Sequence, residues 1–125
     1  MARTSLVAPD LTVGAEMVSA LEKSRIQVAV ALWMLTDEYS DWKFVISSPD
    51  FQDLHQSYSR IRTAAEQAGI SYEQIPPVLV LMTTDSFIQS LRSIFAKTKN
   101  VLGMRLGGQT IGDRYVEDAY VYKIA

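Results

Sequence analysis

Hydrophobic residues recur along this chain with two periods, one typical of helices and one typical of strands. Near the start, Val13, Met17 and Leu21 recur at a spacing of four, which places them on one face of a helix. This spacing predicts a first helix that opens at Pro9 and ends near Ser24 or Arg25.

Two further helices are predicted from the same period and from capping signals. Asp50 is expected to cap the second helix, because its carboxylate can accept free backbone N–H groups of the first turn. Gly69 is expected to close that helix in a left-handed conformation. Thr84 or Asp85 is expected to cap the third helix. The expected core stripes are Leu54, Tyr58, Ile61, Ala65 and Ala68 in the second helix, and Ile88, Leu91, Ile94 and Phe95 in the third.

Strand patterns occupy most of the remaining chain. Residues 26–35 are apolar on both sides of a strand, and a short polar loop joins them to a strand over 42–47, which predicts an antiparallel hairpin. Residues 78–82 are apolar throughout and are expected to form a strand buried on both faces. Residues 101–124 predict a long hairpin that turns at Gly112.

The resulting order, α-β-β-α-β-α-β-β, predicts an α+β (mixed α/β) fold with a five-stranded mixed sheet and three helices. Strands joined through a helix are expected to run parallel with right-handed crossovers, and both hairpins are expected to be antiparallel. The chain has 125 residues and no linker, so we expect a single domain over 1–125 with a flexible N-terminal arm over 1–9.

The composition narrows the possible chemistry. There are 12 Lys and Arg residues, 14 Asp and Glu residues, one histidine and no cysteine. The lack of cysteine excludes disulfides, cysteine-based zinc sites and a cysteine nucleophile. The charge balance does not indicate nucleic-acid binding, and no cofactor is predicted. The longest apolar run, 28–35, is too short to span a bilayer, so we expect a cytoplasmic protein without membrane association.

The segment between the first two strands holds the candidate catalytic residues. Asp41 and Lys43 match the D-x-K half of a nuclease signature, in which carboxylates bind Mg²⁺ and the lysine helps to position or activate water. The earlier acid would be Asp37, only four residues before Asp41. So short a pattern also occurs by chance, and a solvated hairpin turn is the favoured alternative. Whether an acidic cluster binds a metal stays open.

The candidate binding residues lie in the last strand and before it. Asp118 is expected to share an otherwise apolar strand face, so it needs a charged partner or a raised pKa. The other residues of that face are Val116, Tyr120, Tyr122 and Ile124. Arg105 or Arg114 is expected to supply that partner, and a structural salt bridge is favoured over an acid/base or ligand-gripping role. The complete set of candidates is Arg105, Glu117, Asp118, Tyr120 and Tyr122.

Two further motifs are assigned structural roles. The glycine-rich stretch 103–112 precedes no helix, so it predicts bulges and a tight turn rather than a phosphate cradle. His55, the lone histidine, is expected at the surface or its boundary.

Six tyrosines and two tryptophans in so short a chain favour an interface, because these side chains can bury one end and keep the other wet. Several lie on the predicted last hairpin, which is expected to form a sheet edge. We therefore favour a small non-enzymatic binding module that self-associates, most simply as a dimer, and a further protein partner stays open. The alternatives are a small ligand-binding protein and a metal-dependent enzyme that uses Asp41 and Lys43.

Segments 31–33, 45–49 and 117–120, followed by Tyr122, resemble those of a family of short bacterial proteins over most of the chain. The resemblance implies a soluble protein of accessory-genome or gene-cassette type. It implies no activity and no site residue.

Overall fold

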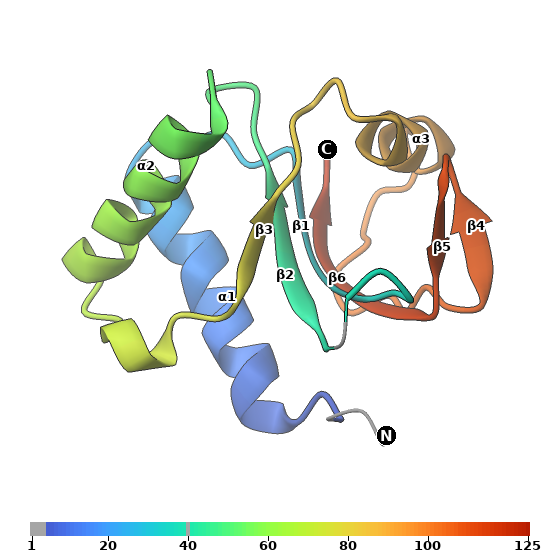
Figure 1. Cartoon of the computed structure of the whole chain (residues 1–125). Helices are drawn as coiled ribbons and strands as arrows, with labels where there is room; N and C mark the ends of the chain where they lie inside the picture. Colours follow the sequence, from blue (N-terminus) through green and yellow to red (C-terminus); the bar gives the residue numbers. More distant parts are fainter. Residues whose placement is uncertain (1–4, 40) are drawn as a thin grey trace.

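The fold is one sheet with a layer of secondary structure on each face (Figure 1). The structure, a computed structural model, describes residues 5–39 and 41–125. Helices α1 and α2 cover one face of the sheet, and helix α3 with a small second sheet covers the other (Figure 1). In chain order the elements are α1 (Ala8–Lys23), β1 (Val30–Leu35), β2 (Lys43–Ser47), α2 (Leu54–Gln67), the short 3₁₀ helix η1 (Tyr72–Gln74), β3 (Val78–Val80), α3 (Ser86–Ile94), β4 (Gln109–Ile111), β5 (Arg114–Val116) and β6 (Asp118–Ile124).

The main sheet has four strands in the order β3-β2-β1-β6. Strand β1 pairs antiparallel with β2 and β6, and β2 pairs parallel with β3. The predicted α+β class, the first hairpin and the parallel crossover through α2 are therefore confirmed. The predicted sheet of five strands is wrong, because β4 and β5 form a separate two-stranded sheet. The crossover through α3 leads into that second sheet, so it adds no parallel neighbour to β3.

Residues 101–124 do not form the single long hairpin that was predicted. They form a short hairpin of β4 and β5 and a separate strand, β6. The predicted turn does lie at Gly112, between β4 and β5, but β6 then leaves to pair with β1. Residues 103–108 run beside β6 without forming a regular strand. Gly103 and Gly108 adopt positive φ values of 83° and 65°, which interrupt the pleat of a strand.

Strand β3 also differs from its prediction. It has three residues, Val78–Val80, and it lies at the edge of the sheet rather than in its interior. Val78 and Leu79 are only half-buried. Pro76 and Pro77 directly precede the strand, and proline is tolerated in sheets mainly at edges and strand starts.

Helix α1 is held close to the sheet by aromatic side chains. The Trp33 indole N–H donates to the carbonyl of Asp10 at 3.2 Å, and the Tyr122 hydroxyl donates to the carbonyl of Leu11 at 2.7 Å. Gly14 makes this approach possible, since a Cβ there would lie 2.2 Å from the Tyr122 hydroxyl oxygen. The predicted apolar face of this helix is confirmed. The expected arm over 1–9 differs at its end, where 8 and 9 belong to α1, and its residues 1–4 lie outside the described residues.

Helix α2 begins three residues later than predicted. Asp53, not Asp50, is the N-cap, and its carboxylate accepts the Gln56 N–H at 2.8 Å. The Asp50 carboxylate instead accepts the backbone N–H of Gln27 at 2.8 Å, which ties the chain after β2 to the start of the β1 segment. Gly69 closes the helix at φ 79°, as predicted. The buried face differs from the predicted stripe and consists of Ser57, Ile61, Ala64 and Ala65.

Helix α3 forms the core of the opposite layer. Asp85 caps it, with its Oδ1 accepting the Phe87 N–H at 2.9 Å. Phe87, Ile88 and Leu91 are buried against the sheet, whereas Ile94 is 60% exposed although its spacing predicted a core position. Ile94 is the last residue of the helix.

Candidate functional site

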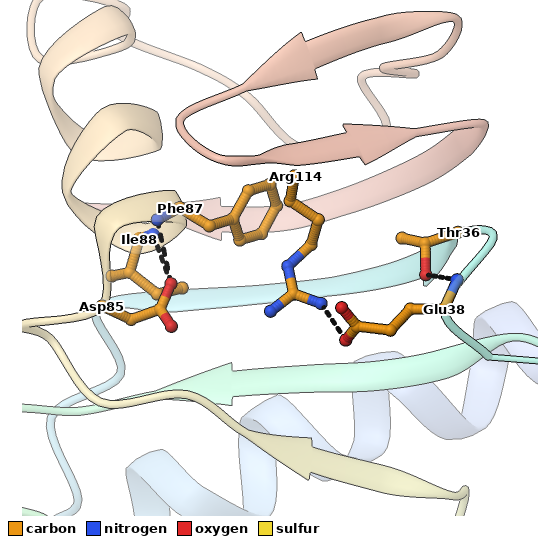
Figure 2. Close-up of polar contacts among 6 residues, drawn as sticks. All are labelled: Thr36, Glu38, Asp85, Phe87, Ile88 and Arg114. Carbon is orange, nitrogen blue, oxygen red and sulfur yellow. Dashed lines mark hydrogen bonds and ion pairs between the residues drawn. The ribbon is translucent and has the colours of Figure 1, made fainter.

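The loop after β1, the start of α3 and strand β5 meet at Arg114 (Figure 2). The guanidinium Nη1 donates to the Glu38 carboxylate at 2.7 Å, and the Arg114 side chain is only 15% exposed. The Phe87 ring lies beside the guanidinium, with 5.8 Å between the Arg114 Cζ and the ring centroid. The Glu38 backbone N–H in turn donates to the Thr36 hydroxyl at 3.2 Å (Figure 2).

The charges around Arg114 hold it in its ionised form. Burial opposes the charge, but the Glu38 carboxylate outweighs burial, with smaller contributions from Tyr39 and Asp85, so the pKa of Arg114 is raised. Burial also raises the pKa of the Tyr39 hydroxyl, and the adjacent Glu38 carboxylate raises it further. The Arg114 Nε is buried and has no hydrogen-bond partner.

A hollow of about 180 Å³ lies beside this cluster. Three carboxylates line it, those of Asp37, Glu38 and Asp113, against the single guanidinium of Arg114. This surplus of negative charge opposes an anionic ligand. The unpartnered Nε is enclosed by protein, so no ligand can reach it without rearrangement. We therefore assign Arg114 a structural role, because its ion pair with Glu38 joins the β1–β2 loop to β5.

The three catalytic candidates from the sequence do not line one hollow. Asp37 lies beside Arg114, whereas Asp41 lines a separate hollow with Trp33 and Trp42. The Lys43 ammonium lies over the Tyr39 ring, 5.6 Å from its centroid. Within residues 5–39 and 41–125, no group of three or more His, Asp or Glu side chains could hold a metal ion.

Asp118 pairs with Arg105, one of its two predicted partners. Both Arg105 Nε and Nη2 donate to the Asp118 carboxylate, the former at 3.2 Å. The Arg105 side chain is 56% exposed and that of Asp118 33% exposed, so this is a surface ion pair. The other predicted partner, Arg114, binds Glu38 instead.

The stripe predicted to contain Asp118 is divided between the two faces of the sheet. Tyr120 and Tyr122 pack towards α1 and α2, whereas Val116 and Ile124 belong to the core on the α3 side. An irregularity in the β1–β6 register shifts the alternation of side chains near Tyr122. Burial raises the pKa of the Tyr122 hydroxyl to about 12. Tyr120 lies 5.2 Å from Tyr122, ring centroid to ring centroid, so both tyrosines belong to one aromatic cluster.

The chain itself covers the outer edge of β6. The Gly103 N–H donates to the Val121 carbonyl at 2.8 Å, the Val121 N–H donates to the Met104 carbonyl at 2.9 Å, and the Leu106 N–H donates to the Ala119 carbonyl at 3.1 Å. The hairpin aromatics expected at an open edge therefore lie on a strand whose edge is occupied.

The outer edge of β3 is different. The Pro77 carbonyl and the Leu81 N–H bond to β2, so the backbone groups of Val78 and Val80 point away from the sheet. A side chain reaches this edge, because the Tyr58 hydroxyl accepts the Val80 N–H at 3.0 Å.

Two exposed tyrosines and several partly or fully buried apolar side chains surround this edge. Tyr72 is 81% exposed and Tyr58 38% exposed. They border a hollow of about 190 Å³ between α2, η1 and β3. We call the group the β3-edge surface, and its members are Tyr58, Arg62, Tyr72, Ile75, Pro76 and Val78.

Sequence reasoning missed this surface because Tyr58 fitted the helical stripe of α2 and was assigned to the core. The sequence did contain one signal, since two prolines directly precede a short apolar run. His55 and Glu117, which were also named from the sequence, do not belong to this surface. His55 is exposed in the first turn of α2, and Glu117 is half-buried just before β6.

No family model, no curated protein and no solved structure matches the chain. Among the described residues, no helix combines the length and apolar character needed to cross a membrane.

Proposed function

We propose that the protein is a binding module that self-associates through the β3-edge surface. The observation that carries the proposal is the contrast between the two edges of one sheet. The edge at β6 is covered by residues 103–108, whereas the edge at β3 has exposed aromatic residues around it.

The residue types of this surface support the proposal. Tyrosine and arginine are enriched among residues that dominate binding energy, because each offers a large contact area together with polar groups. Tyr58, Tyr72 and Arg62 provide such groups beside an apolar hollow. That hollow is large enough to receive one side chain from a partner.

Charge supports a second copy of this chain as the partner. The surface contains Arg62, and Glu73 directly follows Tyr72 in η1. A two-fold axis can place Arg62 of one copy opposite Glu73 of the other, which allows the same surface to face itself without like-charge repulsion. A metal-dependent enzyme has less support, because Asp37 and Asp41 line separate hollows.

Light scattering over a dilution series tests the proposal. The wild-type chain is expected to change from dimer to monomer as it is diluted. Tyr72→Glu places an unpaired charge in the contact and is expected to weaken the dimer by at least about 10-fold in Kd. Leu102→Glu is the matched control, because Leu102 is 65% exposed on the segment that follows α3. A wild-type chain that stays monomeric at every concentration would contradict the proposal.

A further inference from the structure

We infer that two copies associate by antiparallel pairing of β3 with β3, and that the Tyr58 hydroxyl acts as a removable guard on this edge. The inference rests on the proposed function and specifies how the contact is made. It joins two four-stranded sheets into one continuous sheet.

The backbone geometry supplies the first step. Val78 and Val80 direct their N–H and C=O groups away from β2, because Pro77 and Leu81 bond to β2 on the inner side. Val80 is only 3% exposed, so its outward groups become accessible to a partner strand when the Tyr58 side chain moves. If a two-fold axis passes beside Leu79, Val78 of one copy faces Val80 of the other. Each such pair exchanges two hydrogen bonds, so the register forms four in total. Other antiparallel registers use fewer of these outward groups.

The second step concerns the Tyr58 hydroxyl, which we call the guard of this edge. The Val80 N–H now donates to the Tyr58 hydroxyl at 3.0 Å, so the edge donor is satisfied by a side chain. Tyr58 is 38% exposed and lies on α2, so its hydroxyl can turn to water when a strand arrives. An edge guarded in this way resists pairing with unrelated strands and yields only when other contacts add to the backbone bonds. The exposed Tyr72 ring and the hollow beside it can provide those contacts.

The opposite edge limits the assembly to two copies. Residues 103–108 already bond to the outer side of β6, so within the described residues the main sheet offers a single edge for strand addition. Antiparallel pairing of two such edges uses both of them, and the assembly closes. This closure favours a second copy of the chain over an unlimited stack of sheets.

Two variants and one exchange measurement test the pairing. Tyr58→Phe removes the guard and is expected to tighten the dimer by about 5-fold per copy, or about 25-fold in Kd overall. Val78→Pro removes an outward donor while leaving the bonds to β2 in place, and it is expected to weaken the dimer by at least about 10-fold. Circular dichroism and a thermal melt check that Val78→Pro is folded.

Amide hydrogen exchange of the wild-type chain gives an independent readout. The Val78 amide is expected to exchange more slowly at dimeric than at monomeric concentrations, whereas the Leu79 amide, which faces β2, serves as the internal control. A dimer in which Val78 exchange is unchanged, or which Tyr58→Phe weakens, would overturn the strand pairing and leave the proposed function intact. A chain that is monomeric throughout would overturn both.

Discussion

The outward backbone groups at the two edges of the main sheet find hydrogen-bond partners in different ways. Every edge strand exposes a row of backbone donors and acceptors that can pair with another chain. At β6 these groups bond to the irregular segment 103–108, which the chain supplies itself. At β3 a single tyrosine hydroxyl meets the outward N–H of Val80. The first arrangement is built into the core, whereas the second can be undone by the rotation of one side chain.

The difference teaches that an edge can be closed without a regular strand. Gly103 and Gly108 adopt left-handed conformations, so the covering segment cannot keep the pleat of a strand. Its central residue Leu106 is nevertheless 5% exposed and packs into the core on the α3 side. Backbone bonding and side-chain burial therefore act together at this edge.

The largest expected effect comes from making the same substitution beside each edge. Leu106→Ala removes a buried side chain from the covering segment and is expected to lower the free energy of unfolding by about 3 kcal/mol. Leu54→Ala, one helical turn before Tyr58 and 52% exposed, is expected to change it by less than about 0.5 kcal/mol. Urea denaturation of both variants at monomeric concentrations measures the two values. Equal losses would show that the edges are not built differently.

A second substitution is expected to open the closed edge. A Cβ at Gly107 would lie 2.9 Å from the backbone oxygen of Glu117, so Gly107→Ala must push the covering segment away from β6. We expect a loss of about 2 kcal/mol of stability. We also expect assemblies larger than a dimer, because the sheet would then offer two edges.

Gly69→Ala is the control for this experiment. Gly69 has a positive φ, so alanine is strained there, but nothing lies within 4 Å of the new Cβ. It is expected to lower stability without changing the state of assembly. Light scattering that finds no species beyond the dimer for Gly107→Ala would contradict the role assigned to the covering segment.

Alkaline pH is expected to weaken the attachment of β6 to α1. The folded-state pKa of Tyr122 is raised to about 12 from an ordinary value of 10, so folding favours the protonated hydroxyl. Its contribution is complete below pH 10 and is lost as the pH rises from 10 towards 12. Tyr122→Phe is expected to flatten this part of the stability profile, measured by urea denaturation at several pH values. A profile equally steep in the variant would assign the loss to other groups.

The smallest expected effect concerns the ion pair that crosses the closed edge. Asp118→Asn is expected to cost about 0.5 kcal/mol at low salt, because the pair with Arg105 is exposed to solvent and screened. The loss should shrink when salt is raised to about 1 M, where the screening length is about 3 Å. Paired melts of variant and wild type at two salt concentrations measure this difference. A loss of stability well above 1 kcal/mol would indicate that Asp118 does more than form an exposed ion pair.

Local patterns in the sequence predicted much of the fold. The helical stripe of α1, the cap at Thr84 or Asp85 and the turn at Gly112 depend on neighbouring residues, and the structure confirms them, with Asp85 as the cap. The β1–β2 hairpin follows from its short loop in the same way. The fold class could therefore be predicted, because these elements and their connections determine it.

The errors lie where distant residues decide the outcome. Asp50 has the chemistry of a helix cap, but its carboxylate bonds to Gln27, which is 23 residues away. Tyr58 fits a helical stripe, yet its hydroxyl is directed to Val80 at the sheet edge. Which of the two sheet edges is covered depends on how residues 103–108 pack beside β6. No local sequence pattern predicts that packing. The candidate surface could thus not be located before the strand order was known.

The bond between Tyr122 and Leu11 spans 111 residues of chain, and it has a consequence for timing. During synthesis at about 5–20 residues per second, Leu11 must wait roughly 6–22 s for its bond with Tyr122. Throughout that interval the side of the helix that contains Gly14 has no β6 to pack against. The packing of this side of the helix is therefore completed only when the last element arrives, whereas β1 and α2 become available to the helix earlier.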